Sequence, residues 1–219
     1  MIKLFKKLIR FLLLIALLFA AGTAGIGYLT YKSAIEKTPI EEKVSQIQDK
    51  TDFKTLGQIS KDFTDAIVAI EDRRFYEHGA IDPIALVRAT IVNFIEGEKQ
   101  QGGSTLTQQV AKNLYFNHEK TYTRKIAELF AAWDLEKQYS KDEILELYVN
   151  LIYYGDGNYG ITEASMNYFG KDPADLSYDE ATLLAGLPQA PSAYALSTNY
   201  ARAKERQEEV IEALDSYRN

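Results

Sequence analysis

Cysteine is absent from this sequence of 219 residues, and histidine occurs only twice, at His78 and His118. Without cysteine there is no disulfide framework, no thiolate nucleophile and no thiolate metal ligand. Two histidines are too few for a histidine-rich metal site with its usual three or four ligands. The sequence therefore predicts no metal held by the protein, and cysteine usage says nothing about the compartment.

Strand-like alternation of apolar and polar residues is nearly absent, and we find no internal repeat or low-complexity tract. Apolar residues recur at helical spacing instead, as in Phe63, Ile67 and Ile70. Asp82 followed by Pro83 is typical of a helix start. Further starts near 106, 141 and 178 are marked by the capping pairs Thr105 with Gln108, Ser140 with Glu143 and Ser177 with Glu180. With helices also expected at 59–73, 123–139, 161–169 and 200–217, the predicted fold class is all-α, mostly helical.

Charged residues are missing from residues 11–31, and the four charges that precede this run are all basic. About 20 apolar residues cross a bilayer as a helix, and basic flanks favour the cytoplasmic side. We therefore predict a membrane helix with a cytoplasmic N-terminus. A cleaved signal peptide is the alternative, with Ala20 and Ala21 at the cleavage site, but the apolar run continues well beyond them. Gly22, Gly25 and Gly27 would permit a close helix contact, although small residues in such segments are commonly just tolerated.

The predicted organisation is a cytoplasmic terminus at 1–10, a membrane helix at 11–31, a polar linker at 32–54 and one domain at 55–219. The first 32 residues hold five basic and no acidic residues, which leaves 20 basic against 31 acidic residues for the rest. This acidic excess argues against binding to nucleic acid. Between residues 99 and 125, however, five basic residues accompany a single acid. That local excess predicts a pocket for a small anion.

The stretch QGGSTLTQQVAKN, residues 101–113, places two glycines directly before a helix start. Glycines allow a sharp turn there, and the free N–H groups of a helix start favour an anion such as phosphate. Gln108, Gln109 and Lys112 fall on one helix face. Lysine comes nine residues after Gly103, which is unlike the nucleotide-binding P-loop. A well-capped surface helix is the alternative interpretation.

Two glutamates stand out for chemistry. Glu71 and Asp72 end an apolar helix, with Phe75 and His78 close behind, and a glutamate at the mouth of an apolar cleft can serve as a general base or acid. Glu128 lies on a helix that is apolar on two sides, so its charge needs a partner, of which Arg124 is the simplest. Alternatively, Glu71 and Asp72 are surface acids at a helix end, and Glu128 forms a structural salt bridge.

These stretches, in this order, resemble the peptidoglycan glycosyltransferases, which occur as monofunctional enzymes and as the N-terminal half of bifunctional penicillin-binding proteins. The resemblance covers about residues 60–196. It rests on EDRRFYEH at 71–78, GGSTLTQQVAKN at 102–113, RKIAELFAA at 124–132, KDEILELYVN at 141–150, and the segment from NYGITEASMNYFGK to GLPQAPSAY at 158–194.

The resemblance implies a lysozyme-like helical fold that polymerises lipid II into β(1→4) glycan strands and releases undecaprenyl pyrophosphate by an inverting displacement. Glu71 would be the general base, and Glu128 the second glutamate that organises the site. Asp72, Phe75 and His78 would position Glu71. The matching substrate-binding positions are Gly103, Ser104, Thr107, Gln108, Gln109, Lys112, Asn113, Lys120, Arg124 and Lys125.

The same resemblance implies lipid II, the growing lipid-linked glycan chain and membrane lipid as partners, cell-wall synthesis proteins as candidate protein partners, and no nucleic acid. It implies no required cofactor and leaves Mg²⁺ or Mn²⁺ as the only candidates. The catalytic domain would lie outside the cell membrane, with the apolar helix at 84–95 resting in the outer leaflet. Two departures stand out: Gly79 comes one position earlier than in many relatives, and the chain ends at Asn219, so no transpeptidase domain is expected.

Two rival functions stay open from the sequence. A lytic muramidase of the same fold type would use Glu71 as a general acid to cleave glycan, although its substrate has no pyrophosphate for the basic cluster to bind. A membrane-anchored scaffold that binds lipid II without converting it is the other.

Overall fold

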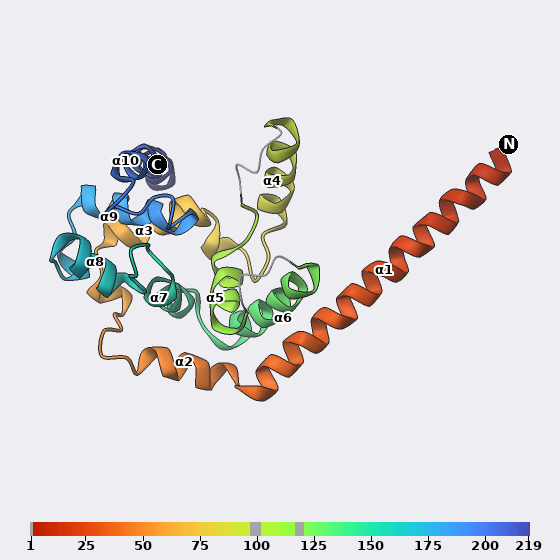
Figure 1. The fold of residues 1–219 in the computed structure, drawn as a ribbon, viewed down its shortest axis with the longest axis horizontal. Coiled ribbons are helices and arrows are strands. Elements are labelled where there is room, and N and C mark those ends of the chain that lie inside the picture. The colour runs from red at the N-terminus through yellow and green to blue at the C-terminus, as the bar shows by residue number, and fades with distance from the viewer. Residues whose placement is uncertain (1, 97–101, 117–120) are drawn as a thin grey trace.

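The computed structural model describes residues 2–96, 102–116 and 121–219, and this part of the chain is almost entirely helical (Figure 1). Ten α-helices are described: α1 Ile2–Lys37, α2 Ile40–Gln48, α3 Lys61–Glu71, α4 Pro83–Glu96, α5 Leu106–Tyr115, α6 Tyr122–Gln138, α7 Lys141–Leu151, α8 Ile161–Phe169, α9 Tyr178–Gly186 and α10 Tyr200–Arg218. Short 3₁₀ turns lie at Leu56–Gln58, Phe75–Glu77, Pro173–Asp175 and Leu187–Gln189. No strand occurs within these residues, so the predicted mostly helical class is confirmed.

Local capping explains where several helices begin. Ser140 and Ser177 each form a complete capping box with the glutamate three residues on, and Gly170 ends α8 in the left-handed conformation at φ 68°. The capping box predicted for α5, between Thr105 and Gln108, is only half formed. Thr105 accepts a hydrogen bond from the Gln108 amide, but the Gln108 side chain bonds elsewhere. The predicted helix starts near 106, 141 and 178 are thus confirmed.

The core lies between the helices that surround α3. Helix α3 packs against α9 and α10, while α5 packs against α6 and α7. Phe63 and Ile67 of α3 are fully buried, and the Phe63 ring lies 6.3 Å from that of Tyr154. Removing so large a buried side chain costs about 3–5 kcal/mol, because the cavity cannot collapse fully. This packing fixes the C-terminal end of α3, where Glu71 lies.

The region predicted as a linker, residues 32–54, does not form an extended stalk. It contains the end of α1 and the whole of α2, whose Ile40, Val44 and Ile47 are buried and pack against the domain. α2 contacts α7, so the packed body begins near residue 40. A short apolar stripe within a polar segment gave too weak a signal to predict this helix.

Two helices expose apolar surface. α1 projects away from the body, and an 18-residue apolar window within Phe5–Lys37 has none of its residues buried, so it is long and apolar enough to cross a membrane (Figure 1). α4 projects as well, with Ile84, Leu86 and Val87 more than half exposed. The structure therefore excludes a central, buried position for this apolar helix. The turn at Gly79 has open space around it, so its early position requires no special backbone.

Candidate active site

A polar cavity of about 310 Å³ opens where α3, α5 and α6 meet the 3₁₀ turn at Leu187–Gln189 and α10. The C-terminal end of α3 forms one side, the start of α5 with its preceding turn a second, and α6 a third. Its walls are Ile70, Glu71, Gly102, Ser104, Gln108, Gln109, Lys112, Lys125, Glu128, Pro188, Gln189 and Arg206. A second cavity of about 380 Å³ adjoins it, shares Ile70, Glu71, Gly102, Gln189 and Arg206, and adds Ala69, Arg73, Arg88 and Glu209. Glu71 therefore lies on the boundary between the two cavities.

Glu71 is the last residue of α3 and is half-buried. Burial raises the pKa of its carboxyl group, because the charged form loses water. The hydrogen bond from Gln109 and the nearby charge of Arg206 act in the opposite direction but leave the pKa raised. Gln109 Nε2 donates to Glu71 Oε2 at 2.8 Å. This carboxylate can therefore take up a proton more readily than a solvated glutamate can.

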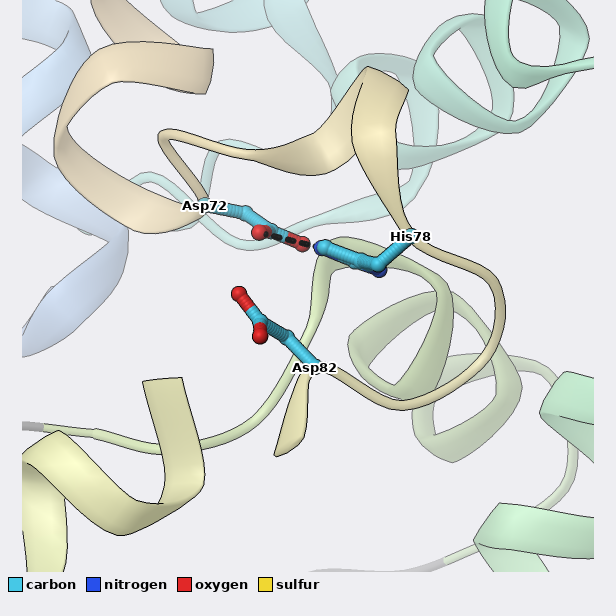
Figure 2. A group of neighbouring side chains, drawn as sticks. All are labelled: Asp72, His78 and Asp82. Atoms are coloured by element: carbon cyan, nitrogen blue, oxygen red, sulfur yellow. Dashed lines mark hydrogen bonds and ion pairs between the residues drawn. The ribbon is translucent and has the colours of Figure 1, made fainter. Parts of the chain in front are cut away.

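The residues that follow Glu71 in the sequence form a polar cluster of Asp72, His78 and Asp82 (Figure 2). His78 Nε2 lies 2.7 Å from Asp72 Oδ1, and His78 Nδ1 lies 2.6 Å from the Gly79 carbonyl oxygen. Burial alone would lower the pKa of His78, but the hydrogen bonds to Asp72 and Gly79 reverse this effect and leave the pKa raised. Because both ring nitrogens face acceptors, His78 fits here as a doubly protonated cation. Asp72 also accepts from the Leu106 amide at 3.0 Å, so the cluster joins the end of α3 to the start of α5.

The same cluster is the natural place to test for a metal site, because ligand atoms of Asp72, His78 and Asp82 lie within 4.8 Å of one another. Asp82 is already bound at both oxygens, however. Arg74 donates to them at 2.7 and 3.0 Å, and the amides of Ile84 and Ala85 cap the same carboxylate. Burial raises the pKa of Asp82, but these hydrogen bonds outweigh burial and lower the pKa to about 2. With every oxygen of both aspartates engaged, these residues do not fit a resident metal ion.

At the start of α5, several backbone amides that the sequence predicted to be free for an anion are bound within the protein. The Leu106 amide is bound by Asp72, the Gln108 amide by the Thr105 hydroxyl, and the Gln109 amide by the Thr105 carbonyl. Side chains supply the polar groups instead. Gln108 donates to the Ala80 carbonyl at 2.9 Å and accepts from Lys125 at 3.1 Å.

Helix α6 brings three charges together. Glu128 is almost fully buried and forms ion pairs with Arg124 and with Lys125, the latter at 3.2 Å. Lys125 Nζ also donates to Ser104 Oγ at 2.8 Å. Burial, helped by the like charges of Arg124 and Lys112, lowers the pKa of Lys125 to about 8. Glu128 thus holds two cations at the cavity and is itself neutralised by them.

The residues predicted from the sequence divide into groups. Seven line the cavity: Glu71, Ser104, Gln108, Gln109, Lys112, Lys125 and Glu128. Asp72, His78 and Arg124 contact one another or lining residues without lining the cavity themselves, and Gly103 lies against Leu86 and Ala89 of α4. Phe75 is buried beneath Lys141, Thr107 donates to Glu136 at 2.5 Å, and Asn113 donates to the Gln109 carbonyl on an exposed face. Lys99 and Lys120 lie outside the described residues.

Sequence reasoning missed Gln189 and Arg206, which line both cavities. Arg206 lies on α10 and is almost fully buried, and its Nε has no hydrogen-bond partner among the described residues. One signal was available. Arg206 occupies a position in the buried stripe that also contains Ala203 and Val210, where an arginine is unusual.

Comparison with known proteins identifies similar chains. The transglycosylase family profile matches residues 37–215. A protein of Cupriavidus necator whose name places it among the transglycosylases is 42% identical over 203 residues, which cover 93% of this chain and 86% of that protein. Penicillin-binding protein 1A of Neisseria lactamica is 46% identical over 75% of this chain, and penicillin-binding protein 1F of Bacillus subtilis is 38% identical over 94%. The matches cover only 21% and 31% of those two longer proteins.

Proposed function

The chain belongs to the transglycosylase family and is a glycosyltransferase, and we propose that it polymerises lipid II into β(1→4) glycan strands of peptidoglycan. In this proposal the donor is a lipid-linked glycan whose anomeric carbon carries undecaprenyl pyrophosphate. The acceptor is a second lipid-linked disaccharide with a free 4-hydroxyl group. The observation that carries the proposal is one cavity that combines the half-buried carboxylate of Glu71 with the cations Lys112, Lys125 and Arg206.

Glu71 takes the proton from the acceptor 4-hydroxyl group as its oxygen attacks the anomeric carbon of the donor. The bond from that carbon to the pyrophosphate oxygen breaks in the same displacement, which inverts the configuration. The raised pKa of Glu71 supports this role, because a base with a pKa nearer to the working pH accepts a proton more effectively. Its place between the two cavities leaves room for a donor on one side and an acceptor on the other.

Lys112 and Lys125 neutralise the departing pyrophosphate. Both line the donor-side cavity, and charge that develops on a leaving group is stabilised most by charges that are already in place. Glu128 positions Lys125 and Arg124 through its two ion pairs. Asp72, His78 and Asp82 do not fit a resident metal ion, and this mechanism uses the protein's own side chains, without a step through Mg²⁺ or Mn²⁺.

The lytic muramidase remains the nearest rival for the same geometry. It would use Glu71 as an acid, and a raised pKa suits that role too. A second carboxylate is needed for glycan hydrolysis, however, and Glu128 in the same cavity is already paired with two cations. A glycan substrate would also give Lys112 and Lys125 no anion to bind.

Incubation of the full chain in detergent or vesicles with labelled lipid II separates the candidates. Polymer indicates a synthase, shortened glycan a hydrolase, and retention without conversion a binding protein. We expect polymer from the wild type, and a loss of about 10²–10⁴-fold for Glu71→Gln. Glu77→Gln is the matched control, because its carboxylate is exposed and close by in sequence. Equal rates for wild type and Glu71→Gln at equal folded fraction would exclude this mechanism.

The membrane arrangement is part of the proposal. α1 would span the bilayer with its N-terminus in the cytoplasm, and the apolar face of α4 would rest in the outer leaflet where the substrate lipids lie. Because the chain has no cysteine, single cysteines at residues 5 and 50 can be labelled selectively. A membrane-impermeant maleimide should reach residue 50, but not residue 5, on intact cells.

A further inference from the structure

The membrane helix does not simply leave the domain: its last turns lie along the outer side of α6. α1 and α6 contact each other extensively, and Figure 1 shows their lower ends side by side. On α1 the residues withdrawn from solvent recur at helical spacing, namely Thr23, Gly27, Tyr31, Ala34 and Ile35. The rest of the helix is largely exposed. This stripe is therefore a defined contact face, which we call the α1 seat.

Gly27 is the closest point of the α1 seat. A Cβ atom placed there would lie 2.6 Å from Ile126 Cγ2, 2.7 Å from Ile126 Cβ and 2.9 Å from the Thr123 carbonyl oxygen. Real Cβ atoms do not approach other atoms so closely, so any larger residue would push α1 and α6 apart. Gly22 and Gly25 on the same helix have open space around them. Only Gly27 of these three is required by packing.

Aromatic residues extend the contact one turn further. The Tyr31 ring stacks on Phe130 with 5.6 Å between centroids, and the Tyr28 ring meets Phe130 edge-on at 5.2 Å. The Tyr31 hydroxyl donates a hydrogen bond to Asp134. Trp133, the single tryptophan of the chain, lies 6.1 Å from Phe130 between ring centroids. This combination fixes both the separation of the two helices and their rotation about each other.

The opposite face of α6 carries the chemistry. Ile126, Phe130 and Asp134 follow at intervals of four and face α1, whereas Lys125 and Glu128 lie on the other side of the helix and line the cavity. A helix held between two contacts transmits a displacement of one face to the other, since packed interiors do not deform smoothly. The seat and the cavity are thus opposite sides of a single rigid element.

We propose that Gly27 and Tyr31 are positioning residues of the transferase reaction: by seating α1 on α6, they set the location of Lys125 and Glu128 in the donor cavity. This inference rests on the proposed function for its kinetic consequences, and on the contact geometry alone for its structural ones. The membrane helix would then act as one wall support of the active site in addition to anchoring the chain.

The test compares Gly27→Leu with Gly22→Leu in the full chain. Both changes add the same side chain to the same apolar helix, but only the first meets Ile126. Restoring ordinary contact at residue 27 requires a movement of about 1 Å, and misplacement by that amount can lower a rate about 100-fold. We expect kcat on lipid II to fall about 10- to 100-fold for Gly27→Leu, with KM changed less than kcat. We expect Gly22→Leu to match the wild type.

Two further measurements distinguish a displacement of α6 from misfolding of the variant. Trp133 emission should shift in Gly27→Leu and stay unchanged in Gly22→Leu, because Trp133 belongs to the aromatic contact. Tyr31→Phe keeps the ring and removes only the hydroxyl, so it should lower kcat severalfold with an unchanged melting temperature. Equal kinetics for the two leucine variants would overturn the proposal. It would also be overturned if stabilising conditions restored the full rate of Gly27→Leu while its Trp133 emission stayed shifted.

Failure of this inference can be told apart from failure of the proposed function. If the wild type does not convert lipid II, the proposed function fails, whereas the seat is still tested by binding of inorganic pyrophosphate to the same variants. About tenfold weaker pyrophosphate binding by Gly27→Leu than by Gly22→Leu would support positioning of Lys125. Equal binding would refute it.

Discussion

The hydrogen bond from Gln109 to Glu71 offers a direct test of how the proposed base is tuned. Gln109 Nε2 lies 2.8 Å from Glu71 Oε2 and favours the ionised carboxylate, against the burial that raises the pKa. Gln109→Ala removes this donor and leaves the burial in place. The pKa of Glu71 should therefore rise further. Since the base works only when ionised, the acid limb of the kcat/KM profile should move to higher pH.

The size of the shift follows from the strength of such a bond. A hydrogen bond to a charged group contributes about 1.5–3 kcal/mol, and one pH unit corresponds to about 1.4 kcal/mol. Loss of the Gln109 donor should thus move the acid limb upward by about one to two pH units. Arg206 remains near Glu71 and limits the shift, because its charge also favours the carboxylate.

The assay is the initial rate of lipid II polymerisation between pH 4.5 and 9 for wild type and Gln109→Ala. Asn113→Ala is the control: it lies one turn further along α5, and its amide bonds the Gln109 carbonyl without touching Glu71. Its absolute rate can change, but its acid limb should stay where the wild-type limb lies. An acid limb that stays in place or moves down in Gln109→Ala would refute the role of Glu71 as the titrating base.

Three further predictions concern other groups. The pKa of Lys125 is lowered to about 8, so the affinity for pyrophosphate should fall as the pH rises through 8. Lys125→Arg should move this fall to higher pH, because arginine stays charged. A pH-independent affinity in the wild type would contradict this prediction. The raised pKa of His78 contributes stability that is fully present below its unfolded value of about 6.5 and is lost as the pH rises through the folded value. The free energy of unfolding should therefore fall in urea titrations as the pH rises above about 6.5, and this slope should shrink in His78→Asn. Ser177→Ala removes the capping box of α9 and should cost about 1 kcal/mol in the same titrations, whereas no loss would show that the cap is dispensable.

The helices could be predicted from the sequence because their signals are local. Serine caps with glutamate three residues on, the proline after Asp82 and the glycine after α8 each act within one turn. They therefore mark helix ends without knowledge of the fold. α2 was missed because its three apolar residues lie in a polar segment, and the helix that covers them, α7, is about 100 residues away in sequence.

The candidate site was predictable in its residue types but less so in its contacts. The adjacent glutamines, the lysines and the backbone amides of a helix start predicted an anion site. The backbone amides of Leu106 and Gln108, however, are hydrogen-bonded to Asp72 and Thr105. Thr107 carried the same signal as its neighbours, and only the packing of α5 against α6 shows that it bonds Glu136 instead of facing the cavity. Arg206 reaches the site from α10, and nothing local to that helix reveals what lies opposite.

The uninterrupted course of α1 from Ile2 to Lys37 limits how far the body can stand from the bilayer. At about 1.5 Å per residue, the six residues beyond Tyr31 add only about 9 Å of rise. A helix that continues for so few residues beyond the bilayer would hold the domain close to the membrane surface. In the proposed arrangement, lipid-linked substrates would reach the domain by lateral diffusion within the leaflet, and the growing strand would leave it on the side away from the bilayer.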